Sequence, residues 1–327
     1  MPNSVKKTDL DYIKAIAQSG SFLAASEVLH VSQPAISQYI SKIEQEQGIQ
    51  LFNRNVRPVT LTEAGRYYVK IEEEIEEMRR RRTRYFRDLL GDLEGEVRIG
   101  ANQCRIATVL SDVLSAYVKK YPKVSLKIVE VGISTMEAKL LAGEIDCVIT
   151  IEAAVSKELA YRTLLDEKVL LAFHADHPLG ERARTYRKSG ATGFLPFDFP
   201  EAAGENFILL SRGMRFHAYF HRICEKYRVK PKILMQTDSI TTLLELVTQG
   251  VGCALMPDSL IYYRHPEPMP CYYSMEHEFG VNRVVAAWNR NMYLSKATRA
   301  FIEMLAEKHR PLNSDPHTAV SYTHLRA

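Results

Sequence analysis

A stretch of hydrogen-bonding side chains between residues 32 and 42 has the composition of a surface that reads nucleic-acid bases. Ile36, Ile40 and Ile43 recur at helical spacing, so they form the buried stripe of one helix. The opposite face carries short uncharged groups and one cation, at Gln33, Ser37, Gln38, Ser41 and Lys42. Amides and hydroxyls hydrogen-bond to base edges and lysine pairs with phosphate, whereas a helix face that meets only water more often carries glutamate and lysine. The pattern favours a DNA-recognition helix and leaves a merely solvated helix as its alternative.

Two further helices and a sharp corner would position this face. A first amphipathic helix covers residues 10–17, and Ser21 caps a second helix. After a short connection Ser32 caps the third helix, which tolerates Pro34 in its first turn and stops at Gly48. A helix, a short turn and a second helix with a polar face are typical of the helix-turn-helix.

The segment after the third helix is predicted to form a β-hairpin. Residues 49–52 and 59–61 are short strand-like runs around a tip that carries Arg54, Arg57 and two asparagines but no acid. Such a wing beside a recognition helix would contact phosphates or an adjacent minor groove. A solvent-exposed loop is the alternative.

The first part of the chain resembles the N-terminal motif of the LysR-type transcriptional regulators without a gap across residues 8–66. The matching residues are Gly20-Ser21-Phe22, Ala24-Ala25, Leu29, Val31 to Ser37, Ile43-Glu44, Gly48, Leu51-Phe52, Arg54, Leu61-Thr62 and Ala64-Gly65. The resemblance implies that Gln33, Pro34, Ser37 and Arg54 meet DNA; Ile43 stands where the family more often has leucine. Residues 1–62 are therefore expected to form a winged helix-turn-helix whose DNA-binding residues are Ser32, Gln33, Pro34, Ser37, Gln38, Ser41, Lys42, Arg54 and Arg57.

Residues 63–91 are expected to form a dimerising linker helix that Gly91 ends. Residues on one seam alternate spacings of three and four, as in a coiled coil: Tyr68, Ile71, Ile75, Met78, Arg82, Tyr85 and Leu89. Glutamates gather at 72–77 and arginines at 79–87, so an antiparallel pair centred near Met78 would set each acidic block against the partner's basic block. Local pairs Glu76–Arg80 and Glu77–Arg81 would add support. A solvated single helix is the alternative.

Residues 92–310 alternate strands and helices, which predicts parallel sheet covered by helices. The strands of a first unit are expected at 96–101, 124–131 and 146–151, and those of a second unit at 168–173, 207–210, 232–236 and 250–257. A strand at 281–289 and a helix at 295–308 would return to the first unit. This order, with Gly143 to Asp146, His177-Pro178-Leu179 and Leu246 to Pro257, resembles the two-lobed periplasmic-binding-protein-like α/β effector domain of the LysR family. Lobe I would comprise 92–166 and 268–310, and lobe II 167–267.

Small ligands of such sheets bind beyond the carboxyl ends of the strands, between the lobes. That rule selects hydroxyls, amides, one arginine and one acid: Asn102, Gln103, Ser134, Thr135, Thr150, Ser211, Arg212 and Asp238. These groups suit a small anion. The alternative is that the hydroxyls only cap helices, and Asp238 leaves an amino-acid-like effector open.

Two stretches depart from the pattern. Residues 180–205 are predicted to be a long loop, either a mobile flap or an insertion. Residues 311–327 are polar and aperiodic and are expected to be a disordered tail.

Composition narrows the function classes. Net charge of +4 hardly favours a polyanion, so DNA binding depends on placement. No metal is expected, because the five cysteines form no C-x-x-C pair and His174 and His177 have no third ligand nearby. No cofactor or enzyme motif occurs, and no signal peptide or long apolar run, so a cytoplasmic location is expected. An enzyme and a solute-binding protein are the rivals from other classes, and a redox regulator that senses through Cys104 is the rival within the family.

The sequence thus predicts a LysR-type regulator whose promoter binding responds to a small, anionic effector in the cleft of the C-terminal domain. Expected partners are double-stranded DNA with a pseudo-palindromic site, the effector, and a second copy in an antiparallel homodimer. A homotetramer is a family expectation, RNA polymerase is a further candidate partner, and no membrane is involved.

Overall fold

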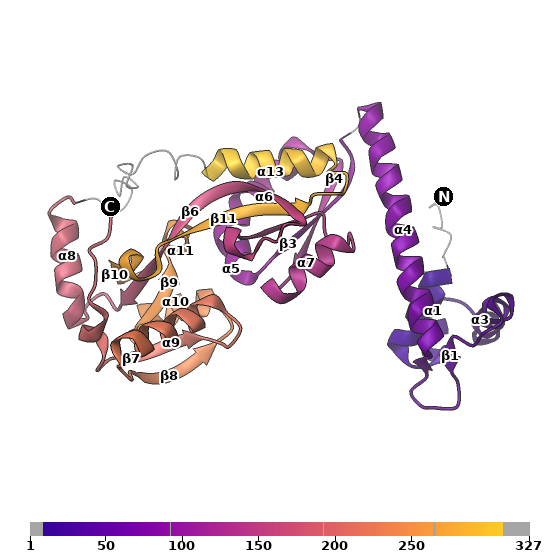
Figure 1. The fold of residues 1–327 in the computed structure, drawn as a ribbon, viewed down its shortest axis with the longest axis horizontal. Helices are drawn as coiled ribbons and strands as arrows, with labels where there is room; N and C mark the ends of the chain where they lie inside the picture. The colour runs from indigo at the N-terminus through magenta and orange to yellow at the C-terminus, as the bar shows by residue number, and fades with distance from the viewer. Residues whose placement is uncertain (1–8, 92, 192, 264–265, 310–327) are drawn as a thin grey trace. The chain divides into compact units, whose positions relative to one another are not determined.

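The computed structural model describes residues 9–91, 93–191, 193–263 and 266–309. The chain divides into two compact units, Met1–Phe86 and Arg87–Ala327 (Figure 1). The predicted tail, residues 311–327, lies outside the described residues.

The first unit is a three-helix domain with a two-stranded wing. Its elements are α1 (Asp9–Ser19), α2 (Phe22–Leu29), α3 (Gln33–Gln47), β1 (Phe52–Asn53), β2 (Thr60–Leu61) and the start of α4 (Glu63–Leu90). Ser21 and Ser32 cap α2 and α3, and Gly48 ends α3 in the left-handed conformation, all as predicted. The wing strands are shorter than predicted, with one antiparallel ladder that pairs Phe52 with Leu61.

A glycine fixes the root of the wing. Gly20 has φ +64°, and a Cβ there would lie 2.6 Å from the Cβ of Pro58. The carbonyl of Gly20 accepts a 2.8 Å hydrogen bond from the N–H of Val59. The corner between α1 and α2 therefore needs a residue without a side chain and holds the returning strand of the wing.

The second unit contains two lobes that share one long strand. Its strands are β3 (Gly95–Ala101), β4 (Val124–Glu130), β5 (Cys147–Ile151), β6 (Leu159–Phe173), β7 (Asn206–Leu210), β8 (Lys232–Thr237), β9 (Ala254–Pro257), β10 (Cys271–Ser274) and β11 (Val281–Asn289). In lobe I the order is β6-β11-β5-β3-β4. The second half of β6 pairs with β9 and β10 in lobe II, and β9 in turn bonds to β7, which pairs with β8. The strands β6 and β11 extend from one lobe toward the other (Figure 1).

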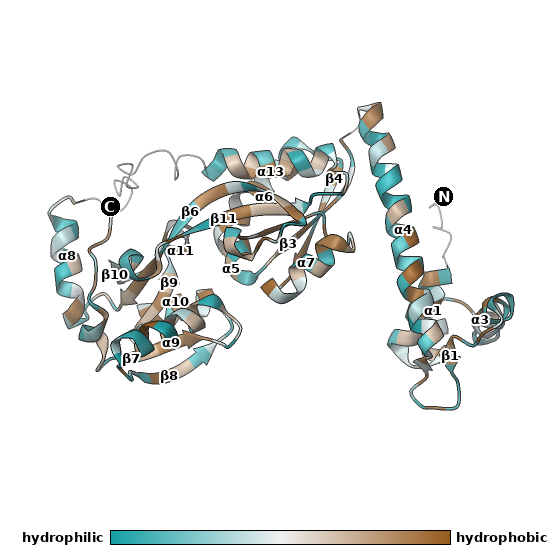
Figure 2. Cartoon of the chain, viewed as in Figure 1, coloured by the Kyte–Doolittle hydropathy of each residue, from teal (hydrophilic) through white to brown (hydrophobic). Residues whose placement is uncertain are grey.

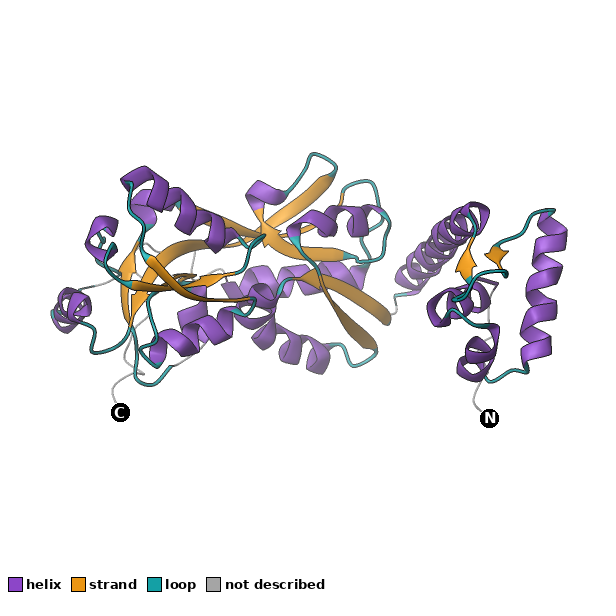
Figure 3. Ribbon diagram, turned by 90° about the horizontal axis from the view of Figure 1, so that it is seen from below, coloured by secondary structure: helices purple, strands orange, loops and turns teal. Residues whose placement is uncertain are grey.

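Helices cover both faces of these sheets (Figure 3). They are α5 (Gln103–Arg105), the π-helical turn Ile106–Leu110, α6 (Ser111–Lys120), α7 (Ile133–Leu141), α8 (Glu181–Lys188), α9 (Arg215–Tyr227), α10 (Ile240–Thr248), α11 (Ser259–Tyr263), α12 (Glu276–Phe279) and α13 (Lys296–His309). Short 3₁₀ turns occupy Glu152–Ala154, Pro178–Gly180 and Phe199–Ala202. The expected mixed α/β fold class is confirmed.

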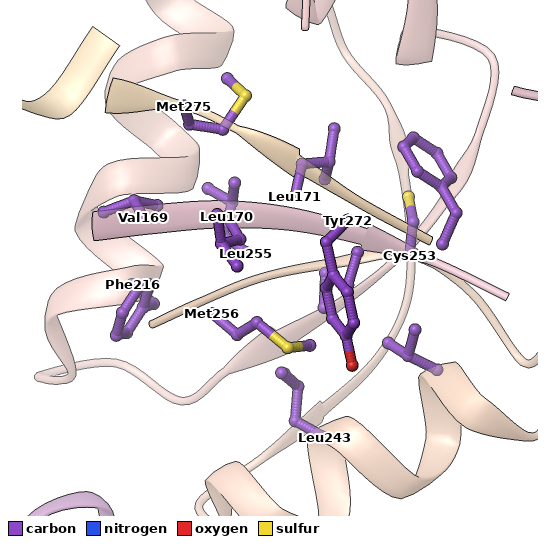
Figure 4. Packing of buried hydrophobic residues seen from close by; sticks show 14 of the residues in the cluster. Val169, Leu170, Leu171, Phe216, Leu243, Cys253, Leu255, Met256, Tyr272 and Met275 are labelled. Atoms are coloured by element: carbon purple, nitrogen blue, oxygen red, sulfur yellow. The ribbon is translucent and has the colours of Figure 1, made fainter. Parts of the chain in front are cut away.

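Each lobe has its own apolar core, and the core of lobe II is the larger. Strand β6 contributes Val169, Leu170 and Leu171 to it, between Leu255 and Met256 of β9 and side chains from neighbouring elements (Figure 4). Cys104, which follows β3 of lobe I, is buried in the same cluster. The start of α5 is therefore packed into lobe II as well as joined to lobe I.

Three sequence predictions for this unit were wrong. The segment 180–205 is not a loose loop, because α8 and a 3₁₀ turn bury Ala183 and Phe199 in the core of lobe II. Strand β6 begins at Leu159, well before residue 168. Strand β10 pairs with residues 170–173 of β6, so the chain returns to lobe I after Ser274 and not at residue 268.

Candidate functional site

One exposed face of α3 gathers most of the residues predicted to bind DNA. Ile36, Ile40 and Ile43 are buried, so the opposite face is turned to solvent. It carries Ser32, Gln33, Pro34, Gln38, Ser41 and Lys42, all exposed, and the half-buried Ser37. Lys42 lies 3.8 Å from Glu46, and both side chains are largely exposed, so this pair holds the lysine only weakly. The face is rich in donors and acceptors that remain available to a partner.

Arg54 in the wing is tied to α3. Its Nη2 donates to Glu44 Oε2 at 2.6 Å and to Ser41 Oγ at 3.3 Å, and its guanidinium lies over the ring of Phe22. The other carboxylate oxygen of Glu44 accepts the backbone N–H groups of Leu51 and Phe52. Glu44 therefore fixes the wing to α3, a role that sequence reasoning missed. Arg57 is exposed at the wing tip.

Only part of the predicted coiled-coil seam of α4 is exposed to solvent. Tyr68 packs against the core of the first unit, and Ile71 and Ile75 are half-buried. The later seam residues Met78, Arg82, Tyr85 and Leu89 are exposed. Hydrophobic and hydrophilic residues alternate along this helix (Figure 2).

The charge blocks of α4 pair within the helix. Glu76–Arg80 and Glu77–Arg81 each lie 3.7 Å apart, as predicted. Glu77 also binds Arg80 and Arg84, and these arginines leave its side chain 4% exposed. Some of the basic block is therefore already neutralised within one helix.

A pocket of about 300 Å³ opens where strands of the two lobes end. Asn102 and Gln103 follow β3, Thr150 lies in β5 and Asp238 follows β8, so the structure brings these predicted residues together at the pocket wall. Apolar side chains complete the wall, among them Ile133, Leu210, Met214 and Phe216.

The other predicted effector residues lie outside this pocket. Ser134 and Thr135 are exposed in the first turn of α7, where the Thr135 hydroxyl donates to the carbonyl of Gly132. Ser211 is part of the turn that leads into α9, and Arg212 is exposed there. They follow strand ends, but they are not among the residues that line the pocket.

A largely buried charge cluster that sequence reasoning missed adjoins the pocket and contributes two arginines to its wall. This cluster, here called the hinge cluster, comprises Arg105, Glu167, Arg215, Asp258 and Ser259. Arg105 donates to both oxygens of Glu167, at 2.6 and 2.9 Å. Nη2 of Arg215 donates to Glu167 Oε2 at 3.0 Å, and the Ser259 hydroxyl donates to Oε1 at 2.5 Å. Arg105 comes from lobe I, Glu167 from the shared strand and Arg215 from lobe II, so the cluster joins both lobes at the strand that crosses between them.

One guanidinium nitrogen of this cluster is unsatisfied. Arg105 and Arg215 both line the pocket, and Nη1 of Arg215 is buried with no hydrogen-bond partner among the described residues. An unpaired buried donor on a cation costs free energy, which a ligand acceptor would recover.

The two acids of the hinge cluster titrate in opposite directions. Burial alone would raise the pKa of Glu167, but Arg105 and Arg215 lower it to about 2. Burial and the charge of Glu167 raise the pKa of Asp258 to about 8, although its Oδ1 accepts the N–H of Lys168 at 3.0 Å. At neutral pH Glu167 is ionised and Asp258 is mostly protonated.

Cys104 lines the same pocket, but burial raises the pKa of its thiol to about 11. The thiol is therefore protonated at neutral pH, unlike a reactive cysteine. In the described part of the chain, no three histidine, cysteine, aspartate or glutamate residues gather as they would around a metal ion.

A helix-turn-helix with a wing, and a two-lobed domain with a pocket at its strand ends, are the parts expected of a ligand-responsive transcriptional regulator. Residues 8–66 match the family described as "Bacterial regulatory helix-turn-helix protein, lysR family", and residues 90–310 match the "LysR substrate binding domain". The chain belongs to the LysR family of DNA-binding transcriptional regulators, which are not enzymes.

Several relatives align along most of the chain. "Uncharacterized HTH-type transcriptional regulator YcgK" of Bacillus subtilis (strain 168) is 28% identical over 307 residues, which are 91% of this chain and 93% of that protein. "Probable RuBisCO transcriptional regulator" of Thalassiosira pseudonana is 27% identical over 77% of this chain and 81% of its own length. The crystal structure of CbnR, a LysR family transcriptional regulator, has a TM-score of 0.63 at 21% identity and covers 92% of this chain and 98% of its own. No described helix has the length and apolar character that crossing a bilayer requires.

Proposed function

We propose that this regulator binds a pseudo-palindromic promoter site through α3 and the wing, and that a small organic carboxylate in the pocket modulates that binding. The buried, unpartnered Nη1 of Arg215 at the pocket wall is the observation that carries the ligand class. A carboxylate oxygen would supply the missing acceptor, and Asn102 and Thr150 would add polar contacts.

The pocket lies between lobes that share β6, so a ligand that contacts both lobes favours one relative arrangement of them. Such a ligand shifts the conformational equilibrium by its difference in affinity for the arrangements. In an oligomer this shift would change the spacing of the DNA-binding wings, which is an allosteric coupling between pocket and promoter. A chain in a dimer with twofold symmetry would recognise two half-sites about one or more helical turns apart.

The ligand class is tested on the full chain with a thermal-shift panel of small carboxylates and inorganic oxyanions. At least some carboxylates should raise the melting temperature, and the same compounds should alter DNA affinity. Arg215→Gln should abolish the shift. Arg212→Gln, an exposed arginine outside the pocket, is the matched control and should keep it. A panel in which no carboxylate stabilises the wild-type chain would contradict the proposal.

Antiparallel pairing of α4 is proposed for the dimer. The exposed seam from Met78 to Leu89 supplies apolar surface, and the order of the charge blocks supports opposite directions. Met78→Cys in both subunits should crosslink through residue 78. A matched Leu89→Cys variant should crosslink poorly, because the helix ends would lie far apart; efficient crosslinking only at residue 89 would exclude the antiparallel arrangement.

Redox sensing through Cys104 is the second candidate. A relative of 26% identity over 273 residues is the "Hydrogen peroxide-inducible genes activator" of Pectobacterium carotovorum subsp. carotovorum. The raised pKa of Cys104 argues against this function, since peroxide reacts with thiolates. Peroxide should therefore leave DNA binding unchanged; a change that Cys104→Ser removes would favour the redox function.

A further inference from the structure

The pocket has opposite charges at its two ends, which the topology of the lobes defines. One end lies at the shared strand β6, because the guanidinium groups of Arg105 and Arg215 both bind Glu167 on that strand. The other end lies at the strands farthest from β6, which are β4 in lobe I and β8 in lobe II.

Each of those outer strands ends in an acid at the pocket wall. Glu130 is the last residue of β4, and Asp238 directly follows β8. Glu130 and Asp238 are both exposed. Among the described residues, neither carboxylate has an ion-pair or hydrogen-bond partner.

At the hinge end, the ion pairs leave one guanidinium nitrogen without an acceptor, so this end can bind one anion. Arg105 uses both terminal nitrogens on Glu167, so this pair is self-compensated. Nη2 of Arg215 donates to the same carboxylate, whereas Nη1 has no acceptor. The hinge end thus offers one donor set for a carboxylate, while the outer end offers two carboxylates to a cation.

A second anionic group on a ligand would meet Glu130 and Asp238, and like charges at short range cost free energy. An ammonium group there would instead gain charge-assisted hydrogen bonds. Apolar side chains of the same pocket, Ile133, Leu210 and Met214, suit the hydrocarbon part of a ligand.

From this polarity we propose that the effector is an amino-carboxylate: its carboxylate binds Arg215 at the hinge end, and its ammonium group binds Glu130 and Asp238 at the outer end. The inference rests on the proposed function of the pocket and narrows its ligand from carboxylates in general to compounds that also carry an amine.

Two sets of probes test it on the full chain by calorimetry and thermal shift. In each set one skeleton carries an amine, a hydrogen or a second carboxylate at the same carbon. The sets are 5-aminopentanoate, pentanoate and hexanedioate, and 6-aminohexanoate, hexanoate and heptanedioate, in which a hydrocarbon chain separates the two charged groups.

In at least one set, the amino acid should bind about tenfold or more tightly than the carboxylate without an amine, as expected for hydrogen bonds to charged groups. The dicarboxylate should bind most weakly. The double variant Glu130→Gln, Asp238→Asn should lose this preference and accept the dicarboxylate better than the wild-type chain does. The control Glu225→Gln, an exposed acid of α9 outside the pocket, should keep the wild-type order.

The outcomes separate this inference from the proposed function. If the plain carboxylates or the dicarboxylates bind as tightly as the amino acids, and Arg215→Gln weakens them, the carboxylate pocket stands and the amino-carboxylate assignment is overturned. If the double variant keeps the wild-type preference, the assignment of the ammonium to Glu130 and Asp238 is overturned. If neither these probes nor the wider carboxylate panel binds the wild-type chain, the proposed function itself fails.

Discussion

The helix-turn-helix unit and the two-lobed unit hold their functional polar groups in opposite ways. On α3 the amides and hydroxyls are exposed, and the pairing of Lys42 with Glu46 is loose. In the hinge cluster, Arg105 and Glu167 are 4% and 1% exposed and satisfy each other. The polar groups of α3 therefore remain available to a partner, whereas most of those in the hinge cluster are already bonded to one another in the folded chain. Substitutions should therefore change binding in the first unit and stability in the second.

The largest expected effect is in the hinge cluster. Glu167→Gln removes the charge that compensates Arg105 and Arg215, and breaking one side of a buried ion pair costs about 3–5 kcal/mol. Chemical denaturation of the full chain measures it. The matched control is Glu303→Gln, whose pair with Arg162 is about half exposed and should contribute about 1 kcal/mol or less. Equal losses in the two variants would mean that the buried cluster stabilises the chain no more than an exposed ion pair does.

Asp258 provides a second stability test, with a defined dependence on pH. Its folded pKa of about 8 lies above the ordinary value of 3.8, so the folded state holds an extra proton between these values. The free energy of unfolding should therefore fall as the pH rises from about 4 to about 8. Asp258→Asn cannot ionise and keeps an acceptor for the N–H of Lys168.

The Asp258→Asn variant should be more stable than the wild-type chain by about 1–3 kcal/mol at pH 8 and nearly equal to it at pH 4.5. In a chain of this size each kcal/mol corresponds to about 2–4 °C in melting temperature. Glu167 titrates in the opposite sense and contributes stability that is lost only as the pH falls toward 2. A stability difference that does not change with pH would mean that Asp258 is ionised in the folded state.

The two units also differ in how far their sequence predicts them. The caps at Ser21 and Ser32, the stop at Gly48 and the buried stripe of α3 all depend on neighbours within a few residues, so local pattern found them. The wing was placed correctly, but its attachment through Glu44 was not foreseen, because that contact joins residues ten apart.

The pocket between the lobes depends on contacts between residues far apart in the sequence, which local pattern does not show. Asn102, Gln103, Thr150 and Asp238 were predicted to lie together because strand ends converge in this class of fold. Arg105 and Glu167 are 62 residues apart, and each is an ordinary charged residue in its own segment. The first half of β6 was missed for a related reason: charged residues from Asp166 to Lys168 interrupt its apolar pattern where the strand crosses between lobes.

For DNA binding the larger effect should come from Gln33. Its amide lies exposed near the N-terminus of α3, where a side chain reaches base edges. Gln33→Ala should reduce discrimination at one base position by about 1–3 kcal/mol. Binding to a library of promoter variants measures this. A uniform loss across all sequences would place Gln33 on the phosphate backbone instead.

Lys42 should show the smallest effect and a different signature. Its ammonium group is exposed, and because the Glu46 pair at 3.8 Å is weak, it is free to meet a phosphate. Lys42→Ala should weaken binding equally on all sequences and reduce the slope of log affinity against log salt by about 1. Titrations of one DNA site across several salt concentrations measure the slope. Lys14→Ala, which removes a lysine paired with Glu73 at 2.6 Å, is the control and should leave the slope unchanged. If Lys42→Ala instead changes the preferred sequence and leaves the slope intact, the division of α3 into base-reading amides and a phosphate-binding lysine is wrong.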